Sequence, residues 1–191
     1  MEKGGNEKIF GGLGAIFVVL SFVPYVGFIL GIAGIVLLFI ALHKFGEIFQ
    51  DKNIFNKFLT GFLVSLAGII IFFIFGIFSF IPIFMNARHE GGAPMNFDMG
   101  MFGIGIIFAV IVFYIINIIA TNYYRQCFNL MSEYTNINLF RLAGTFIFWG
   151  AIGLIAFGLG AIAILVGWIL LAVAFFSLPQ TYDTVDTIPP E

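Results

Sequence analysis

Charged residues divide this sequence into four long apolar runs, and that division constrains the fold more than any other feature. Asp, Glu, Lys and Arg are absent from residues 9–42, 58–87, 99–124 and 142–182. A transmembrane helix needs roughly 20 predominantly apolar residues to cross a hydrocarbon core about 30 Å thick, and each run is long enough. We therefore expect an integral membrane protein whose main partner is the lipid bilayer.

The composition excludes a soluble fold. The chain of 191 residues is 61% hydrophobic and 9% charged. A soluble domain has roughly 45–50% apolar and about 25% charged residues, and it could not hide this excess from water. The formal net charge of -2 includes no basic stripe, so nucleic acid is not expected as a partner. The single cysteine, Cys127, excludes an intrachain disulfide.

The outer two runs are too long for one crossing and barely long enough for two, whereas each central run suits one long, tilted helix. Each outer run has a break near its middle. Pro24 in "SFVPYVG" removes a backbone donor and clashes with the preceding turn. Gly158 and Gly160 in "FGLGAI" permit a tight reversal. Each outer run is therefore expected to form a hairpin.

These breaks predict an all-α, polytopic membrane helix bundle of about six helices, with short first and last hairpins and two long central helices. Residues 1–178 are expected to form a single integral membrane domain, followed by a flexible polar tail at 179–191. Because the outer helices are short, a four-crossing arrangement with two re-entrant hairpins is the main alternative. The predicted spans are about 7–23, 25–42, 58–85, 100–123, 142–157 and 160–178.

Basic residues predict the orientation in either arrangement, because a crossing hairpin and a re-entrant hairpin both return the chain to the same face. Seven of the eight basic residues lie in the N-terminus and in the linkers 43–57 and 124–141, whereas the loop 86–98 holds only Arg88. Cytoplasmic segments are enriched in Lys and Arg. Both termini are therefore expected in the cytoplasm, and the loop is expected outside.

The two linkers resemble each other. "FGEIFQDKNIFNKFLTG" (45–61) aligns without gaps to "FNLMSEYTNINLFRLAG" (128–144). Asn53 and Asn136 each precede an apolar run, where an asparagine is expected to cap the next helix. Phe45, Ile48 and Phe49 predict an amphipathic turn along the inner membrane surface, because they lie on one side of a helix.

Three segments carry a resemblance to a known family: "GGLGAIFVVLSFVPYVGFILGIAGIVLLFIAL", "DKNIFNKFLTGF" and "WILLAVAFFSLP". Through these segments the chain resembles a family of small prokaryotic membrane proteins that is catalogued as a domain of unknown function, number 996. The resemblance implies a multi-pass protein from an archaeon or a bacterium. It implies no activity, ligand or catalytic residue.

The predicted spans contain no formal charge and no catalytic pattern. Their serines lack a neighbouring histidine that could act as a base, and no aspartate lies in a span. His89 has no second histidine at the spacing of a metalloprotease, and His43 is expected on the opposite face of the membrane. We therefore expect no enzyme and assign no catalytic residue, cofactor-binding residue or cofactor.

One helix face is polar. Tyr114, Asn117, Thr121 and Arg125 follow one another at helical spacing. They could line a path or bind a lipid headgroup, but we favour hydrogen bonding between helices, which is typically worth about 0.6 kcal/mol per contact in a membrane.

Small residues at helix-packing spacing include the pair Gly27 and Gly31, which could join helices of one chain or of two copies. Trp149 and Trp168 fall near the middle of their predicted helices, where interfacial tryptophan is not expected. Either they pack inside the bundle or the last two spans are misplaced.

The predicted outer loop is rich in possible soft-metal ligands. Met85, His89, Met95, Met99 and Met101 carry the thioether and imidazole groups that suit Cu(I). However, "EGGAPMN" has the residues of a chain reversal, and methionine is also an ordinary apolar residue. We therefore interpret the segment as a loop and assign no metal site.

These patterns predict a non-enzymatic membrane scaffold or interaction protein of the prokaryotic cytoplasmic membrane. The second hypothesis is a small transporter or channel for a neutral solute or a soft metal. A homo-oligomer or a complex with other membrane proteins remains open.

Overall fold

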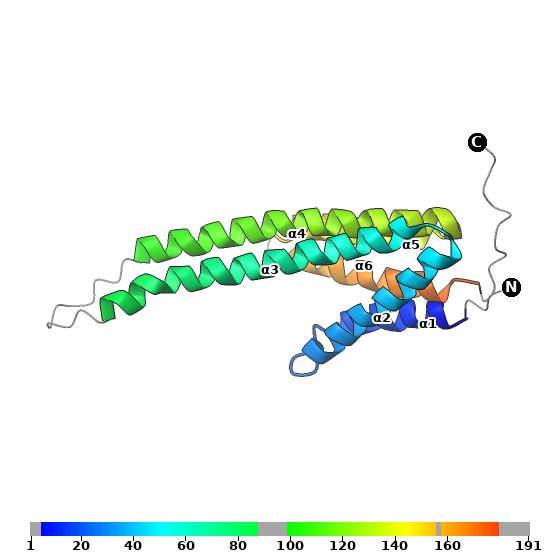
Figure 1. The fold of residues 1–191 in the computed structure, drawn as a ribbon, viewed down its shortest axis with the longest axis horizontal. Coiled ribbons are helices and arrows are strands. Elements are labelled where there is room, and N and C mark those ends of the chain that lie inside the picture. The colour runs from blue at the N-terminus through cyan, green and yellow to red at the C-terminus, as the bar shows by residue number, and fades with distance from the viewer. Residues whose placement is uncertain (1–4, 88–98, 156–157, 180–191) are drawn as a thin grey trace. The chain divides into compact units, whose positions relative to one another are not determined.

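The computed structural model describes residues 5–87, 99–155 and 158–179 (Figure 1). The described chain is entirely α-helical, as predicted, and the two central helices have 36 and 37 residues. The six helices are α1 (Gly5–Leu20), α2 (Gly27–Ile48), α3 (Lys52–Ala87), α4 (Met99–Thr135), α5 (Asn138–Gly153) and α6 (Leu159–Phe176).

Both outer runs reverse where the sequence predicts. α1 ends at Leu20 and α2 begins at Gly27, so Pro24 lies in the connection. Before α6, Gly158 has a φ of 78°, a left-handed conformation that glycine adopts without steric cost. The structure therefore confirms two hairpins, α1–α2 and α5–α6.

The chain forms two compact units, which we describe separately. Unit 1 contains residues 1–61 and 121–191, and unit 2 contains residues 62–120. In unit 2, α3 and α4 pack as an antiparallel pair: the rings of Phe72 and Phe113 are 5.2 Å apart, and those of Phe75 and Phe108 are 5.4 Å apart.

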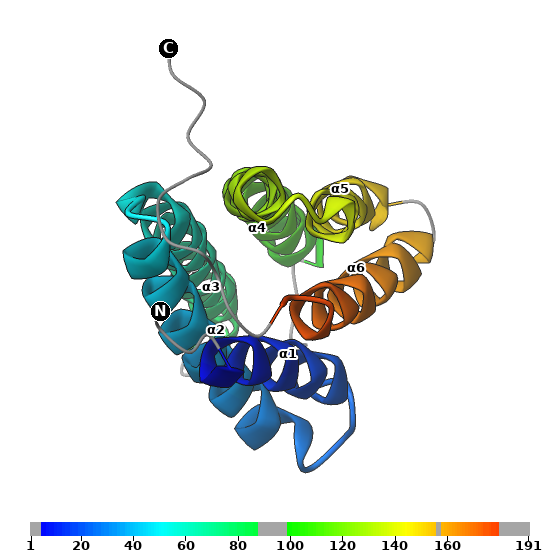
Figure 2. The ribbon, with the colours of Figure 1, turned by 90° about the vertical axis from the view of Figure 1, so that its right-hand side faces the viewer.

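In unit 1, α1 lies between α2 and α6, and α5 lies on the other side of α6 (Figure 2). Glycines make the close approaches possible. A Cβ atom on Gly34 would lie 2.7 Å from the carbonyl oxygen of Gly14, and one on Gly150 would lie 2.8 Å from that of Gly160. Gly27 likewise lies against the backbone of Ser21. These glycines therefore pack helices of the same chain, an alternative that the sequence left open.

The core of unit 1 consists of apolar side chains. The ring of Phe175 is stacked on Phe45 at 6.0 Å and meets the edge of Phe140 at 5.0 Å. Phe58 and Phe128 bring the start of α3 and the end of α4 into the same core, with ring centroids 6.3 Å apart. Cys127 is fully buried beside them.

The predicted asparagine caps are wrong. Asp51 caps α3, because its Oδ1 accepts a hydrogen bond from the backbone N–H of Asn53 at 2.8 Å. Ile137 occupies the N-cap position of α5 without a side-chain cap. Asn136 instead has a φ of 56°, a left-handed conformation that asparagine tolerates and that lets the chain turn after α4.

The amphipathic turn predicted at the end of α2 also faces another way. Phe45 is fully buried, and Ile48 and Phe49 pack against the same core. Phe49 additionally stacks on Tyr134, with ring centroids 5.2 Å apart. These residues therefore hold unit 1 together, because the side of α2 that we expected to lie on the membrane packs against other helices of the unit.

Among the described residues, four helices are long and apolar enough to cross a membrane: Gly27–Ile48, Lys52–Phe78, Gly103–Thr135 and Leu159–Phe176. The protein is therefore a multi-pass membrane protein. α1 and α5 have only 16 residues each. The ending of α5 at Gly153 places Trp149 one turn from its end, where it is exposed, while Trp168 packs against the core.

Candidate functional site

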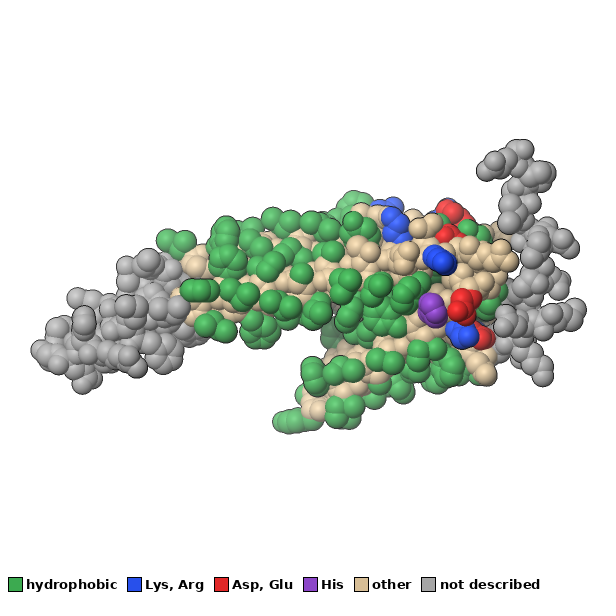
Figure 3. All heavy atoms as spheres, in the orientation of Figure 1, with side chains coloured by type: hydrophobic (Ala, Val, Ile, Leu, Met, Phe, Trp, Pro, Cys, Tyr) green, Lys and Arg blue, Asp and Glu red, His purple; other side chains and the backbone are tan. Residues whose placement is uncertain are grey.

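One end of unit 1 gathers the polar groups of four chain segments. The Lys8 ammonium donates a hydrogen bond to the carbonyl oxygen of Leu178 at 3.1 Å. The Tyr134 hydroxyl donates to Oδ2 of Asp51 at 3.1 Å. We call the connections α2–α3 (49–51) and α4–α5 (136–137) the two elbows. The start of α1 therefore lies beside the end of α6, and the two elbows lie beside each other. Figure 3 shows charged side chains over this end, whereas the described side chains of unit 2 include none.

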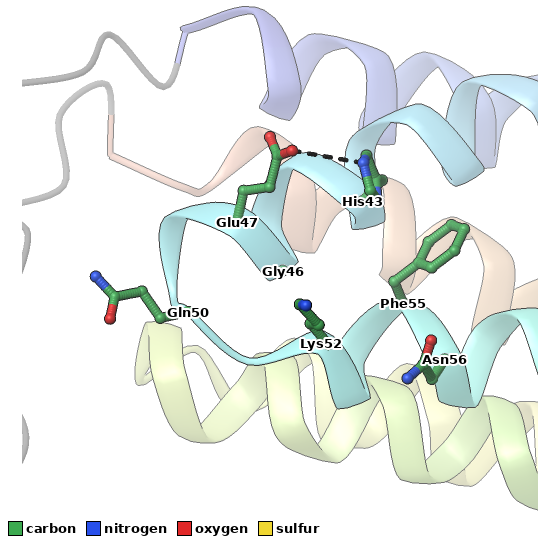
Figure 4. A pocket seen from close by; sticks show the side chains of 7 residues that line it. All are labelled: His43, Gly46, Glu47, Gln50, Lys52, Phe55 and Asn56. Carbon is green, nitrogen blue, oxygen red and sulfur yellow. Dashed lines mark ion pairs between the residues drawn. The ribbon is translucent and has the colours of Figure 1, made fainter.

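A pocket of about 600 Å³ lies at this end, between the last turns of α2 and the first turns of α3 (Figure 4). We call it the elbow pocket. It combines one aromatic ring with cationic, anionic and amide side chains. Its lining residues are His43, Gly46, Glu47, Gln50, Lys52, Phe55 and Asn56.

The acidic residue of the elbow pocket is already paired. Glu47 lies 3.5 Å from Nε2 of His43 and 3.4 Å from Nζ of Lys44. The imidazole of His43 also meets the ring of Phe55 edge-on, with centroids 5.0 Å apart. Because the side chains of His43, Lys44 and Glu47 are all more than half exposed, each of these contacts contributes less than about 1 kcal/mol. The contacts of Glu47 therefore hold side chains of the pocket in position and add little to the stability of the fold.

The other side of the elbow is held by Asp51. Its two oxygens bind the Asn53 N–H and the Tyr134 hydroxyl, so the carboxylate is directed away from the pocket lining. Tyr134 lies one residue before the end of α4, beyond the predicted span. The phenol of Tyr134 is an exposed, neutral donor to this carboxylate.

The predicted polar face of α4 is divided between the two units. In unit 1, the guanidinium carbon of Arg125 lies 5.2 Å from the ring centre of Phe148, and its Nε is buried without an acceptor among the described residues. In unit 2, the Asn117 amide donates to the carbonyl oxygen of Phe113, one turn back, at 2.9 Å. Tyr114 and Thr121 are partly buried. These residues do not form one compact site.

The predicted outer loop (86–98), with its possible soft-metal ligands, falls mainly outside the described residues. His89 and Met95 lie there, and the side chains of Met85, Met99 and Met101 are likewise not described. The described parts of the chain hold no group of three His, Cys, Asp or Glu residues that could bind a metal ion. Copper binding by the loop therefore stays a hypothesis.

Sequence reasoning missed the elbow pocket. It placed His43 on one face of the membrane and treated the following linker as an amphipathic turn. The available signal was a pair of polar residues at i, i+4 spacing on either side of the elbow: His43 and Glu47 before it, and Lys52 and Asn56 after it. The angle between α2 and α3 brings these two pairs around one cavity, and that angle is not readable from the sequence.

Comparison with known proteins agrees with the membrane fold. Residues 30–169 match the family described as "Protein of unknown function (DUF996)". The chain is 36% identical over 176 residues to the uncharacterized protein MJ1644 of Methanocaldococcus jannaschii, covering 92% of this chain and 93% of the relative. No solved structure matches it. The chain belongs to the DUF996 family.

Proposed function

We propose that this DUF996 protein acts as a non-enzymatic membrane scaffold or interaction protein of the cytoplasmic membrane. The observation that carries the proposal is the exposure of its two longest helices. In the most apolar window of each of α3 and α4, only 11% of the residues are buried. The corresponding shares in α2 and α6 are 28% and 33%.

The described part of unit 2 therefore offers apolar helix surface, since Ala109 and Ala120 are the only buried apolar side chains there. Exposed residues include Phe73 and Ile77 on α3, and Ile104 and Ile107 on α4. A Cβ atom on Gly76 would have no neighbour within 4 Å, so the backbone at this point of α3 is open to close approach. Association of membrane helices depends on packing of this kind, because lipid supplies no hydrophobic driving force. Other membrane-spanning helices are the partners that fit this surface.

The proposal is tested by photo-crosslinking in native membranes. A photoreactive phenylalanine analogue replaces Phe73 in unit 2, and in a matched control it replaces Phe28, an exposed phenylalanine of unit 1. We expect a discrete protein adduct from position 73 and lipid adducts alone from position 28. Lipid adducts alone from both positions, together with a single-chain mass after gentle solubilisation, would contradict an interaction role.

The second candidate is a small transporter or channel for a neutral solute or a soft metal. It is supported by the polar face of α4, where Tyr114, Asn117 and Thr121 are only partly buried. Cysteines introduced along α4 distinguish the candidates, because the native Cys127 is buried and reacts poorly. Water-soluble thiol reagents that modify positions 114, 117 and 121 but not 115 and 119 would favour a path.

A further inference from the structure

The elbow pocket holds polar side chains with unused hydrogen-bonding capacity. Among the described residues, Gln50, Lys52 and Asn56 make no side-chain hydrogen bond and no ion pair. Lys52 lies near the centre of the pocket in Figure 4, with Asn56 one helical turn further along α3. The ammonium of Lys52 and the amide of Asn56 supply several N–H donors on one side of the cavity, whereas the Gln50 side chain points away from them in Figure 4. The free groups therefore match a ligand that is rich in acceptor oxygens.

The charge of that ligand follows from the pairing of the neighbouring carboxylates. Glu47 is opposed by Lys44 and His43, and Asp51 is bound to the Asn53 N–H and to Tyr134. Among the described residues Lys52 forms no ion pair, whereas Glu47 lies within ion-pair distance of Lys44. Hydrogen bonds between an ammonium and a phosphate oxygen are stronger than those between neutral groups. An anionic phosphate group fits the elbow pocket best.

The surface of α2 beside the pocket indicates what the phosphate is attached to. Ile32, Val36 and Ile40 follow one another at four-residue spacing, and each is more than 40% exposed. His43 and Glu47 continue the same line at spacings of three and four residues. One face of α2 is therefore apolar along its length and polar at its end, which matches an amphiphile with a charged head.

We propose that the elbow pocket binds the phosphate-bearing headgroup of a membrane phospholipid, with an acyl chain lying along Ile32, Val36 and Ile40. Lys52 binds the phosphate, and Asn56 donates hydrogen bonds to its oxygens or to the glycerol ester. The volume of about 600 Å³ is within the range of small-molecule sites. The lipid joins the ends of α2 and α3, and this role does not depend on the proposed interaction function.

Native mass spectrometry of the full chain in neutral detergent tests the proposal. The protein is titrated with phosphatidylglycerol, with diacylglycerol, which has no phosphate, and with inorganic phosphate. We expect saturable binding of one phosphatidylglycerol and at least tenfold weaker binding of the other two. Lys52→Gln should weaken phosphatidylglycerol binding about tenfold, which corresponds to roughly 1.4 kcal/mol for one lost charge-assisted contact. Ile40→Ala should weaken binding of the lipid but not of inorganic phosphate.

Arg141→Gln provides the matched control, because Arg141 is an exposed cation on α5 that does not line the pocket. This substitution should change the affinity for phosphatidylglycerol less than twofold. An equal loss of phosphatidylglycerol affinity in Lys52→Gln and Arg141→Gln, or no loss in Lys52→Gln, would overturn the elbow pocket as the binding site. Inorganic phosphate binding as tightly as the lipid would overturn the lipid assignment. Circular dichroism checks each fold. If Lys52→Gln fails to fold, Asn56→Ala must still weaken lipid binding by at least threefold.

Discussion

Lys8 and Leu178 are 170 positions apart in the sequence, yet the Lys8 ammonium donates a hydrogen bond to the Leu178 carbonyl oxygen at 3.1 Å. Leu178 lies two residues beyond the last residue of α6, so the ammonium lies near the C-terminal end of that helix. A cation at this end also interacts favourably with the helix dipole. The first helix therefore closes the end of the last one, and the contact fixes the antiparallel packing of α1 on α6.

Lys8→Gln should lower the stability of unit 1 modestly. The substitution removes the charge from a partly buried contact, so we expect a loss of about 1 kcal/mol in the free energy of unfolding. Lys44→Gln is the control, because Lys44 forms only an exposed ion pair, and it should cost less than about 0.5 kcal/mol. Denaturant titration in mixed micelles measures both variants. Equal stability of Lys8→Gln and the unaltered chain would contradict a structural role for this hydrogen bond.

Two glycines that look alike in the sequence should respond oppositely to alanine. Gly34→Ala places a Cβ atom 2.7 Å from the carbonyl oxygen of Gly14, so α1 and α2 must separate, at a cost of about 1–3 kcal/mol. Gly76→Ala meets no atom within 4 Å and gains helix propensity, so it should be neutral or slightly stabilising. Melting midpoints in detergent distinguish the two. A stable Gly34→Ala would mean that the α1–α2 contact is looser than the structure has it.

The sequence predicts the elements of this fold better than their contacts. Charge-free runs and the breaks at Pro24 and Gly158 predict six helices, because lipid imposes strong constraints on length and polarity. An asparagine before each apolar run predicts an asparagine cap. The structure instead uses Asp51, whose carboxylate at the elbow reaches forward to the Asn53 N–H. Local spacing does not reveal such a turn.

The candidate site is less predictable for a similar reason. The polar face of α4 is visible as a pattern on one helix. The elbow pocket instead depends on the approach of α2 and α3, whose contact includes the edge-to-face rings of Phe39 and Phe58 at 5.2 Å. In a chain with 27 phenylalanines, many ring pairings are compatible with the same hydrophobic pattern. The tertiary arrangement selects among them, so the pocket emerges only from the fold.

The basic residues predict the orientation of the chain across the bilayer. Unit 1 holds every described Lys and Arg residue, at the end where Lys8 meets Leu178. We expect this end in the cytoplasm, because basic residues are enriched on that side. A reporter that is active only outside the cell should work when fused at Gly91 and fail when fused after Gln180. The reverse pattern would refute the orientation, and activity at both positions would refute the odd number of crossings that we expect between them.

The tips of the two hairpins are expected to remain within the bilayer. α1 and α5 have 16 residues each, which rise about 24 Å at 1.5 Å per residue and fall short of a hydrocarbon core of about 30 Å. The tips are also apolar and exposed, with Phe22 and Tyr25 on the first and Ile155 on the second. A tip in water would expose these side chains at a cost, whereas lipid accommodates them. The lengths of α1 and α5 thus favour two re-entrant hairpins, whereas α2 and α6 are themselves long enough to cross.

Cysteine accessibility tests this expectation. Cysteines at Phe22 and Ile155 should resist a membrane-impermeant thiol reagent added to intact cells and also to inverted vesicles. A cysteine at Gln50, an exposed residue of the elbow, should react in inverted vesicles only. The native Cys127 should contribute little background, because it is fully buried. Labelling of positions 22 and 155 in intact cells would instead show that both hairpins cross the membrane completely, giving six spans.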